Sequence, residues 1–201
     1  MNARPPEVLE YRRRLLEAVG RAVADKGYAE ATIADIVREA GVSRRTFYEH
    51  FHAKSDCFIA LYEAASRSAL AVLRESIDPG QPWQTQVERA VGAYLGCLAQ
   101  DPALVRSLFI EILGLGRAGL AARRRVNGEI ARFMMEVVNG DRRAEAAPGL
   151  LTSELATALV GGINELILEA IEQERTGELA TLVEPVSRLV RAVAAGGGGR
   201  A

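Results

Sequence analysis

The sequence predicts an all-α fold, and three observations support this prediction. Apolar residues recur three and four positions apart along most of the 201 residues, which is the spacing of one face of an α-helix. Clusters rich in glycine, proline and asparagine interrupt these segments where helices would end, and no segment alternates between apolar and polar residues as a β-strand does. The predicted helices cover residues 8–26, 32–40, 44–51, 55–77, 83–100, 102–113, 117–139, 152–174 and 178–195.

The first two predicted helices have well-marked ends. The first carries one apolar stripe, which consists of Val8, Tyr11, Leu15, Leu16, Val19 and Val23. Thr32 can cap the second helix through its hydroxyl while Asp35 bonds back, which is a capping box. Gly41 ends this helix, because glycine enters the left-handed conformation at little steric cost.

The third helix is short and presents polar side chains in its first turn. Ser43 can cap it, and Phe47 and Phe51 lie four residues apart on its buried side. The side chains left pointing outward are Arg44, Arg45, Thr46 and Tyr48. Such groups on the second of two short helices, after a tight turn, are typical of a helix that enters the DNA major groove. The alternative is an ordinary helical hairpin with a solvated face, but both caps, the glycine turn and the inward phenylalanines together favour DNA binding.

Residues from about Leu9 to Ala69 resemble the N-terminal domain of the TetR (tetracycline-repressor) family of bacterial transcription regulators. The matching motifs are Gly27-Tyr28, T-I-A-D-I at 32–36, A-G-V-S at 40–43, T-F-Y-E-H-F at 46–51, and Lys54. The resemblance implies that Thr46 and Tyr48 contact DNA and that Lys54 contacts phosphate. The full set of expected DNA-binding residues is Thr32, Ser43, Arg44, Arg45, Thr46, Tyr48 and Lys54.

Two positions depart from the family's pattern. Arg45 stands where the family often has a small residue, which adds bulk and charge to the expected DNA-facing surface. His52-Ala53 replaces a common proline and polar cap, so we expect the entry to the fourth helix to be less well capped.

Charge and composition constrain the function of the protein less closely than these motifs do. Residues 1–55 contain 10 Lys and Arg against 8 Asp and Glu, although the whole chain has a net charge of −1. The two cysteines, Cys57 and Cys97, lie within helical patterns, which favours a reducing compartment. No apolar run is long enough to span a bilayer and the N-terminus lacks a signal-peptide core. We therefore expect a cytoplasmic protein without a membrane partner.

The remainder of the chain is expected to form a larger helical domain for effector binding and dimerisation. We place the DNA-binding domain at residues 9–69, with its helix-turn-helix at 32–51. The second domain is expected at residues 70–195, and the glycine-rich residues 196–201 are expected to form a flexible tail.

Two late helices carry more apolar surface than one subunit requires. Residues 155–171 are apolar over much of the circumference and contain Gly161-Gly162. Glycine in a helix costs about 1 kcal/mol relative to alanine, so this pair indicates close approach of another backbone. The TetR resemblance implies that the helices at 152–174 and 178–195 pair with their symmetry mates, although both stripes could instead pack within one subunit. The expected interface residues are Leu155, Leu159, Gly162, Leu166, Leu182, Val186 and Leu189.

Bulky residues of the middle helices are candidates for an effector cavity, because small-molecule sites are mostly apolar with a few polar groups. The expected ligand-binding residues are Trp83, Tyr94, Phe109, Leu113, Phe133, Met134 and Asn164. Aromatic and methionine residues at helical spacing more often belong to a core, and this alternative stays open.

The sequence predicts a regulator rather than an enzyme. It contains no Ser-His-Asp grouping, phosphate-binding loop or dinucleotide fingerprint, and His50 and His52 lie on different helix faces, which makes a poor metal pair. We expect no cofactor and no metal. The predicted function is a repressor that binds a palindromic operator in double-stranded DNA as a homodimer and leaves it when an unknown small-molecule effector binds. A regulator of the same fold that is controlled by a protein partner is the alternative.

Overall fold

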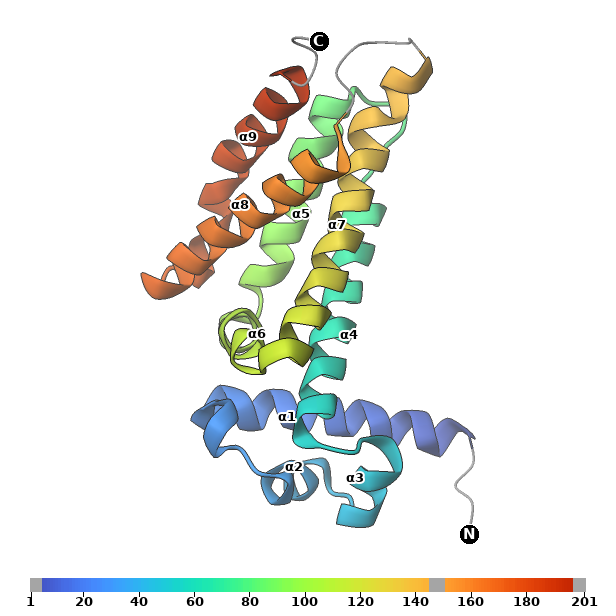
Figure 1. Ribbon diagram of the computed structural model, residues 1–201, viewed down its shortest axis with the longest axis vertical. Coiled ribbons are helices and arrows are strands. Elements are labelled where there is room, and N and C mark those ends of the chain that lie inside the picture. The colour runs from blue at the N-terminus through green and yellow to red at the C-terminus, as the bar shows by residue number, and fades with distance from the viewer. Residues whose placement is uncertain (1–4, 145–150, 197–201) are drawn as a thin grey trace. The chain divides into compact units, whose positions relative to one another are not determined.

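The computed structural model describes residues 5–144 and 151–196, and within these ranges every regular element is a helix (Figure 1). The all-α prediction is therefore confirmed. The elements are α1 (Pro5–Glu30), α2 (Ile33–Ala40), α3 (Arg44–His50), α4 (Lys54–Glu75), α5 (Trp83–Ala99), α6 (Pro102–Gly114), α7 (Gly116–Ala144), α8 (Ser153–Glu172), the 3-10 helix η1 (Thr176–Leu182) and α9 (Val183–Gly196). In these ranges no helix has the length and apolar character needed to cross a membrane. The tail predicted at residues 196–201 lies outside the described residues, apart from Gly196 at the end of α9.

The chain divides into two compact units. The first consists of Met1–Ala65 and Ala103–Ala122, and the second consists of Ser66–Pro102 and Arg123–Ala201. Helices α4 and α7 are each divided between the two units.

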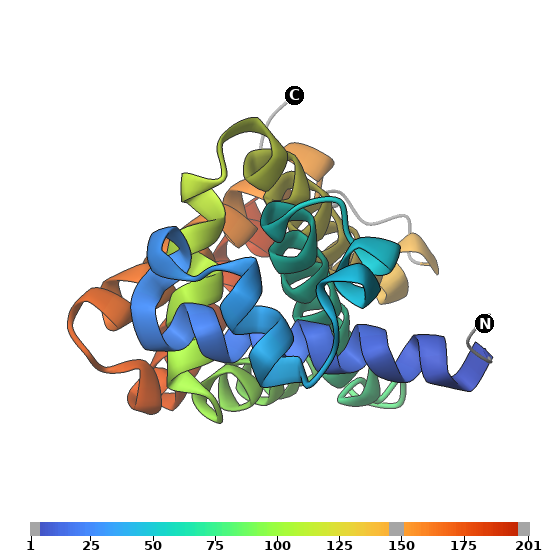
Figure 2. The same cartoon turned by 90° about the horizontal axis from the view of Figure 1, so that it is seen from below.

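The first unit packs α1, α2 and α3 around an apolar core (Figure 2). The side chains that are fully excluded from solvent include Leu15, Val19, Ile36, Phe47 and Phe58. The predicted stripe of α1 is buried from Leu15 onward, but Val8 is 40% exposed. The reason is that the first turns of α1 extend beyond α2 and α3, as Figures 1 and 2 both show.

The second unit contains α5, α8, η1 and α9 together with the later parts of α4 and α7. One buried cluster joins Leu73 of α4, Ala90 of α5 and Phe133 of α7. Helix α7 is also bonded to Leu151, which lies two residues before the start of α8. The Asn139 amide nitrogen donates to the Leu151 carbonyl at 3.1 Å, and the Leu151 N–H donates back to Asn139 Oδ1 at 2.8 Å. Both residues are buried, so this pair satisfies polar groups that would otherwise be costly to bury.

Two helix boundaries differ from the sequence prediction. Helix α7 continues to Ala144 instead of ending at residue 139, because the Asn139 side chain bonds to Leu151 and leaves the helix backbone intact. The last α-helix begins at Val183 instead of residue 178 and follows η1. Pro185 explains this start, since proline lacks an N–H and fits only the first turn of an α-helix.

Candidate nucleic-acid interface and apolar cavity

The turn between α2 and α3 is fixed by the caps that the sequence predicts. The Thr32 hydroxyl accepts a hydrogen bond from the Asp35 N–H at 3.1 Å, and the Thr32 N–H donates to the Asp35 carboxylate at 3.0 Å. Gly41 ends α2 with φ 60° and ψ 41°, and the Ser43 hydroxyl accepts from the Thr46 N–H at 3.0 Å to start α3. The predicted capping box, left-handed glycine and serine cap are all confirmed.

The Asp35 carboxylate is also the centre of a group of polar and charged contacts at the start of α2. Its carboxylate accepts from the Thr32 hydroxyl and backbone and lies 3.2 Å from the Lys26 ammonium. The hydrogen bonds from Thr32, and then the one from Lys26, hold the pKa of Asp35 well below its usual value. Asp35 therefore stays ionised wherever the fold is intact at neutral pH.

Gly41 is constrained by space as well as by its backbone angles. The Arg14 guanidinium of α1 donates to the Gly41 carbonyl at 3.0 Å, and a Cβ at Gly41 would lie only 2.6 Å from Arg14 Nη2. A second tie joins α1 to α2, where Arg21 Nε lies 2.7 Å from a Glu39 carboxylate oxygen. The sequence offered no pairing signal for these ties, because they link residues 27 and 18 positions apart.

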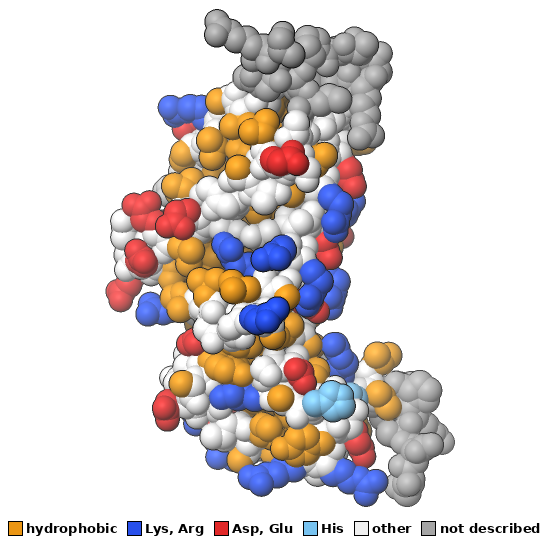
Figure 3. Space-filling view, viewed as in Figure 1, with side chains coloured by type: hydrophobic (Ala, Val, Ile, Leu, Met, Phe, Trp, Pro, Cys, Tyr) orange, Lys and Arg blue, Asp and Glu red, His pale blue; other side chains and the backbone are white. Residues whose placement is uncertain are grey.

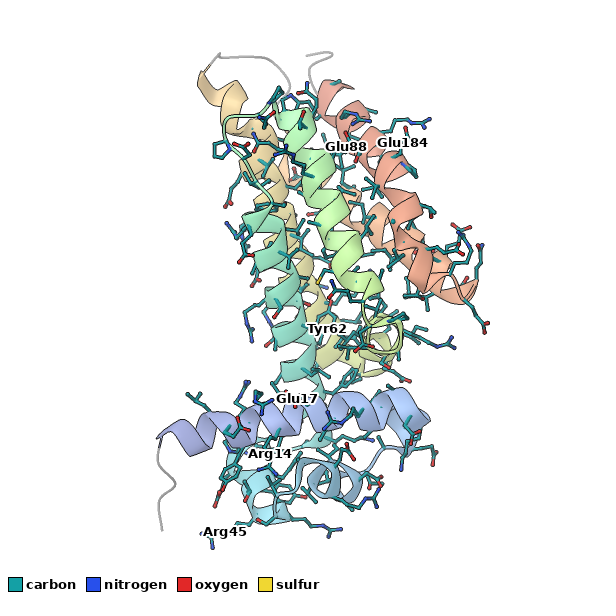
Figure 4. All side chains as sticks on the ribbon, turned by 180° about the vertical axis from the view of Figure 1, so that it is seen from behind. Arg14, Glu17, Arg45, Tyr62, Glu88 and Glu184 are labelled. Atoms are coloured by element: carbon teal, nitrogen blue, oxygen red, sulfur yellow. The ribbon has the colours of Figure 1, made fainter. Side chains whose placement is uncertain are left out.

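Helix α3 divides into a buried face and a free face. Phe47 is fully buried and Phe51 nearly so, and their ring centroids lie 5.8 Å apart. On the free face, the Arg45 side chain is 89% exposed and points away from the helices in Figure 4, with Glu49 as an ion-pair partner at 3.1 Å. Tyr48 is 54% exposed and packs edge-on against the Phe47 ring at 5.5 Å. This geometry leaves the α3 side chains available for a partner.

The remaining predicted DNA-binding residues differ in their exposure and in their partners within the chain. Arg44 is exposed and has no hydrogen-bond or ion-pair partner within the described part of the chain. Thr46 is half-buried and its hydroxyl lies 2.9 Å from the Ser43 hydroxyl. Thr32 and Ser43 act as caps, which positions the α2 and α3 backbones whether or not DNA is present. In Figure 3, Lys and Arg side chains are exposed over α2 and α3 and also over the second unit, with Asp and Glu side chains among them.

Lys54 is directed at the protein itself. Its ammonium donates to the carbonyl oxygens of Tyr28 and Ala31, each at 2.6 Å, and lies 4.2 Å from the centroid of the Tyr28 ring. The start of α4 is thereby attached to the end of α1, a role that the family resemblance did not imply. A phosphate contact by Lys54 remains a prediction.

The entry to α4 is better capped than the sequence suggested. Although His52-Ala53 supplies no polar cap, the Asp56 carboxylate accepts a hydrogen bond from the Ala53 N–H at 3.1 Å. A carboxylate in the first turn also interacts favourably with the helix dipole.

The second unit contains a partly open apolar cavity with a volume of about 60 Å³. Five helices line it, among others through Leu73 of α4, Val87 of α5, Val137 of α7, Val160 of α8 and Val190 of α9. Four predicted ligand-binding residues, Tyr94, Phe133, Met134 and Asn164, also line this cavity.

The other predicted ligand-binding residues lie elsewhere. Phe109 and Leu113 belong to α6 in the first unit, and Leu113 is 42% exposed. Trp83 is buried at the start of α5 and does not line the cavity. Helical spacing identified these residues as bulky and apolar, but it does not specify which cavity, if any, a buried residue faces.

One hydrogen-bonded pair of asparagines lies at the cavity, where Asn164 is part of the lining. Asn164 is 7% exposed, and its amide nitrogen donates to the Asn127 side-chain oxygen at 3.2 Å. The pair leaves further donor and acceptor positions on both amides. A neutral polar group on a ligand could use these positions.

The predicted dimer-interface residues separate into two groups. Leu155 and Leu189 are 36% and 37% exposed, and Gly162, Leu166 and Leu182 are half-buried. Leu159 and Val186 are instead buried within the chain's own second unit, and Val186 lines the cavity. Gly162 and Leu189 lie side by side, since a Cβ at Gly162 would lie 3.8 Å from the Leu189 side chain.

The comparisons with known proteins agree with this geometry. Residues 15–61 match the model of the bacterial regulatory proteins of the tetR family. The fatty acid metabolism regulator protein of Bacillus subtilis (strain 168) is 21% identical over 182 residues, which cover 88% of this chain and 92% of that protein.

Two solved structures share the fold over most of their length. The transcriptional regulator FadR from Bacillus subtilis, in complex with stearoyl-CoA, has a TM-score of 0.78 at 17% identity, covering 90% of this chain and 98% of its own. The fatty acid degradation regulator FadR from Bacillus halodurans has a TM-score of 0.76 at 19% identity, covering 89% of this chain and 96% of its own. The helix-turn-helix geometry and the match over residues 15–61 identify this part of the chain as a tetR-family DNA-binding domain, and the two solved structures share the fold of the chain.

Proposed function

We propose that this TetR-family regulator is a repressor that leaves its operator when a molecule with a fatty acyl chain enters the cavity of the second unit. The observation that carries the proposal is the cavity itself, whose walls are almost entirely aliphatic and aromatic side chains from five helices. Apolar walls suit an acyl chain, because the chain is transferred out of water without the loss of hydrogen bonds. The Bacillus subtilis FadR, which shares the fold, was crystallised with stearoyl-CoA, and this supports the same ligand class here.

The size of the cavity supports a coupling between ligand and DNA. Its volume of about 60 Å³ is well below the roughly 300 Å³ or more of typical ligand pockets. An acyl chain must therefore displace side chains and the helices that carry them, since packed interiors have few alternative arrangements.

Helix α4 is the element through which we expect this displacement to act. It contributes Leu73 to the cavity wall and begins at Lys54, which is bonded to the end of α1. A shift of α4 would change how the α3 helices of a homodimer are presented to two half-sites of a palindromic operator. Since the helical repeat of DNA fixes the spacing of half-sites, such a shift would weaken binding.

The experiment begins with an operator selected by the purified protein from fragments of its source genome. Fluorescence anisotropy would then follow release of the labelled operator during titration with acyl-CoAs of 8 to 18 carbons. We expect at least one chain length to raise the dissociation constant of the operator by about 5- to 150-fold, the usual range of allosteric coupling. Unchanged operator affinity at every chain length would contradict the proposal and favour control by a protein partner.

A further inference from the structure

A second hollow adjoins the apolar cavity of the second unit. The linings of both include Phe133 and Val137, so these side chains border both hollows. The second hollow has a volume of about 330 Å³ and a mixed lining that includes Arg74, Gln86 and Glu136. The apolar cavity therefore adjoins, at the Phe133 ring, a hollow that contains charged side chains.

The charged side chains in this second hollow are Arg74 and Glu136. The Arg74 guanidinium carbon lies 5.2 Å from the centroid of the Phe133 ring, which is within the range of a cation–π interaction. Arg74 Nη1 lies 3.4 Å from a Glu136 carboxylate oxygen, and the two side chains are 53% and 59% exposed. A pair this long and this exposed contributes little to stability, so Arg74 can exchange Glu136 for another anion at small cost.

The apolar cavity could not hold a charged group of a ligand. Among the described residues that line it there is no lysine, arginine or histidine, and its polar side chains are Tyr94 and Asn164. A carboxylate or phosphate buried there would lose its hydration without gaining an opposite charge. The charged end of any ligand must therefore lie outside the apolar cavity.

The geometry points to an amphiphilic ligand whose apolar tail occupies the cavity and whose anionic head is bound by Arg74 in the adjoining hollow. This inference rests on the proposed acyl-binding function and assigns the head group, which the proposed function leaves open. The planar guanidinium can form two parallel hydrogen bonds with a carboxylate or a phosphate, and it already lies against the Phe133 ring, which borders both hollows.

Carboxylates and phosphates share the chemistry that Arg74 would recognise, and three ten-carbon probes separate the possibilities. Decanoate carries a carboxylate, decanoyl-CoA carries phosphates, and 1-decanol has the same tail without a charge. Binding of each probe to the full chain would be measured by calorimetry for the native sequence and for Arg74→Ala, Arg74→Lys and Arg89→Ala. Arg89 is the matched control, because its side chain is also 53% exposed, it also faces one carboxylate, that of Asp78 at 3.6 Å, and it lines neither hollow.

We expect Arg74→Ala to lower the affinity of at least one anionic probe by about tenfold and to leave the affinity of 1-decanol unchanged. A loss of about tenfold is what a charge-assisted contact contributes when solvent screening weakens it. Arg74→Lys should restore part of the loss, and Arg89→Ala should cause none. A loss for decanoate alone identifies a carboxylate head, and a loss for decanoyl-CoA alone identifies a phosphate. Glu136→Gln should raise the affinity of the same probe, since it removes the carboxylate that competes for Arg74.

Equal losses for all three probes, or no loss for any, would overturn the assignment of Arg74 while leaving the acyl-binding function intact. If the native sequence bound none of the probes and no longer acyl-CoA, the proposed function itself would fail, and the assignment with it. Thermal melting of each variant distinguishes lost binding from lost folding.

Discussion

The ammonium of Lys54 lies over the aromatic ring of Tyr28 and donates a hydrogen bond to the carbonyl oxygen of the same residue. The Tyr28 carbonyl belongs to the last turn of α1, where backbone carbonyls lack helical partners and carry the negative end of the helix dipole. A single lysine thereby satisfies this helix end and fixes the first residue of α4 beside it. The position of the helix-turn-helix relative to the start of α4 depends on this contact.

Lys54→Ala should accordingly affect both folding and DNA binding. Loss of hydrogen bonds from a charged donor to two carbonyls should lower the free energy of unfolding by about 1–3 kcal/mol, measured by urea denaturation. If Lys54 also contacts phosphate, the slope of log affinity against log salt should fall by about one unit for every DNA sequence. Lys54→Met keeps the aliphatic stem and serves as the control for packing. Reduced stability with an unchanged salt slope would make Lys54 a structural residue only.

Arg44 and Arg45 should differ in their contribution to sequence preference. Arg45 already has Glu49 as a partner, whereas the exposed guanidinium of Arg44 has none among the described residues. A bidentate arginine–guanine contact contributes about 1–3 kcal/mol of discrimination. Arg44→Ala should therefore relax preference at one position of each half-site in a binding-site selection, and Arg45→Ala should relax it less. Recovery of the parental motif by both variants would mean that neither arginine contacts a base.

Asp35 should make the fold sensitive to acid. Its pKa is lowered in the folded protein by the hydrogen bonds from Thr32, so the ionised form stabilises the fold above the unfolded-state pKa of about 3.9. This stabilisation is lost as the pH falls below that value towards the lower folded-state pKa. Asp35→Asn should melt at a lower temperature than the native protein at pH 7, and the difference should shrink between pH 5 and pH 3. A difference that stayed constant over this range would show that Asp35 acts through its shape and not through its charge.

Gly162→Glu should separate the predicted homodimer into folded monomers. A Cβ at Gly162 would be in ordinary contact with Leu189, so the chain itself can accommodate the substitution. A carboxylate in the predicted dimer interface would be buried without a partner, which costs several kcal/mol. Gly161→Glu is the matched control, because Gly161 is exposed and a Cβ there meets no atom within 4 Å. Light scattering together with circular dichroism would test this, and a dimeric Gly162→Glu protein with normal operator affinity would locate the interface elsewhere.

The helix-turn-helix of the first unit was largely predictable, because the contacts that define it join residues close together in the sequence. The bonds of Thr32 to Asp35 and of Ser43 to Thr46 join residues three apart, so sequence spacing alone determines that they can form. The inward placement of Phe47 and Phe51 follows equally from helical spacing. Lys54 shows the limit of this reasoning, since its bonds to Tyr28 and Ala31 link residues 26 and 23 positions apart.

The cavity was predictable only in part because it depends on how helices face one another. Tyr94 and Phe133 line it, whereas Phe109 has the same apolar and aromatic character but belongs to α6 in the first unit. Arg74 had no distinguishing sequence pattern, since its significance comes from the Phe133 ring 59 positions later in the chain. In the same way, the burial of Leu159 and Val186 separates them from their exposed neighbours only after the helices have packed.

The central claim is that occupation of the cavity releases the operator, and a variant with a filled cavity tests it most directly. Ala90 lines the cavity and is 5% exposed, so Ala90→Leu would place additional carbon atoms in the space that the acyl chain needs. The carbon atoms added by leucine are far fewer than those of an acyl chain, so the variant should keep the helix arrangement of the native protein and bind the operator as it does. Melting would check that overpacking has cost no more than about 1–3 kcal/mol. We expect the acyl-CoA that releases the native protein to leave Ala90→Leu on the operator. Release of both proteins at the same acyl-CoA concentration would contradict the account.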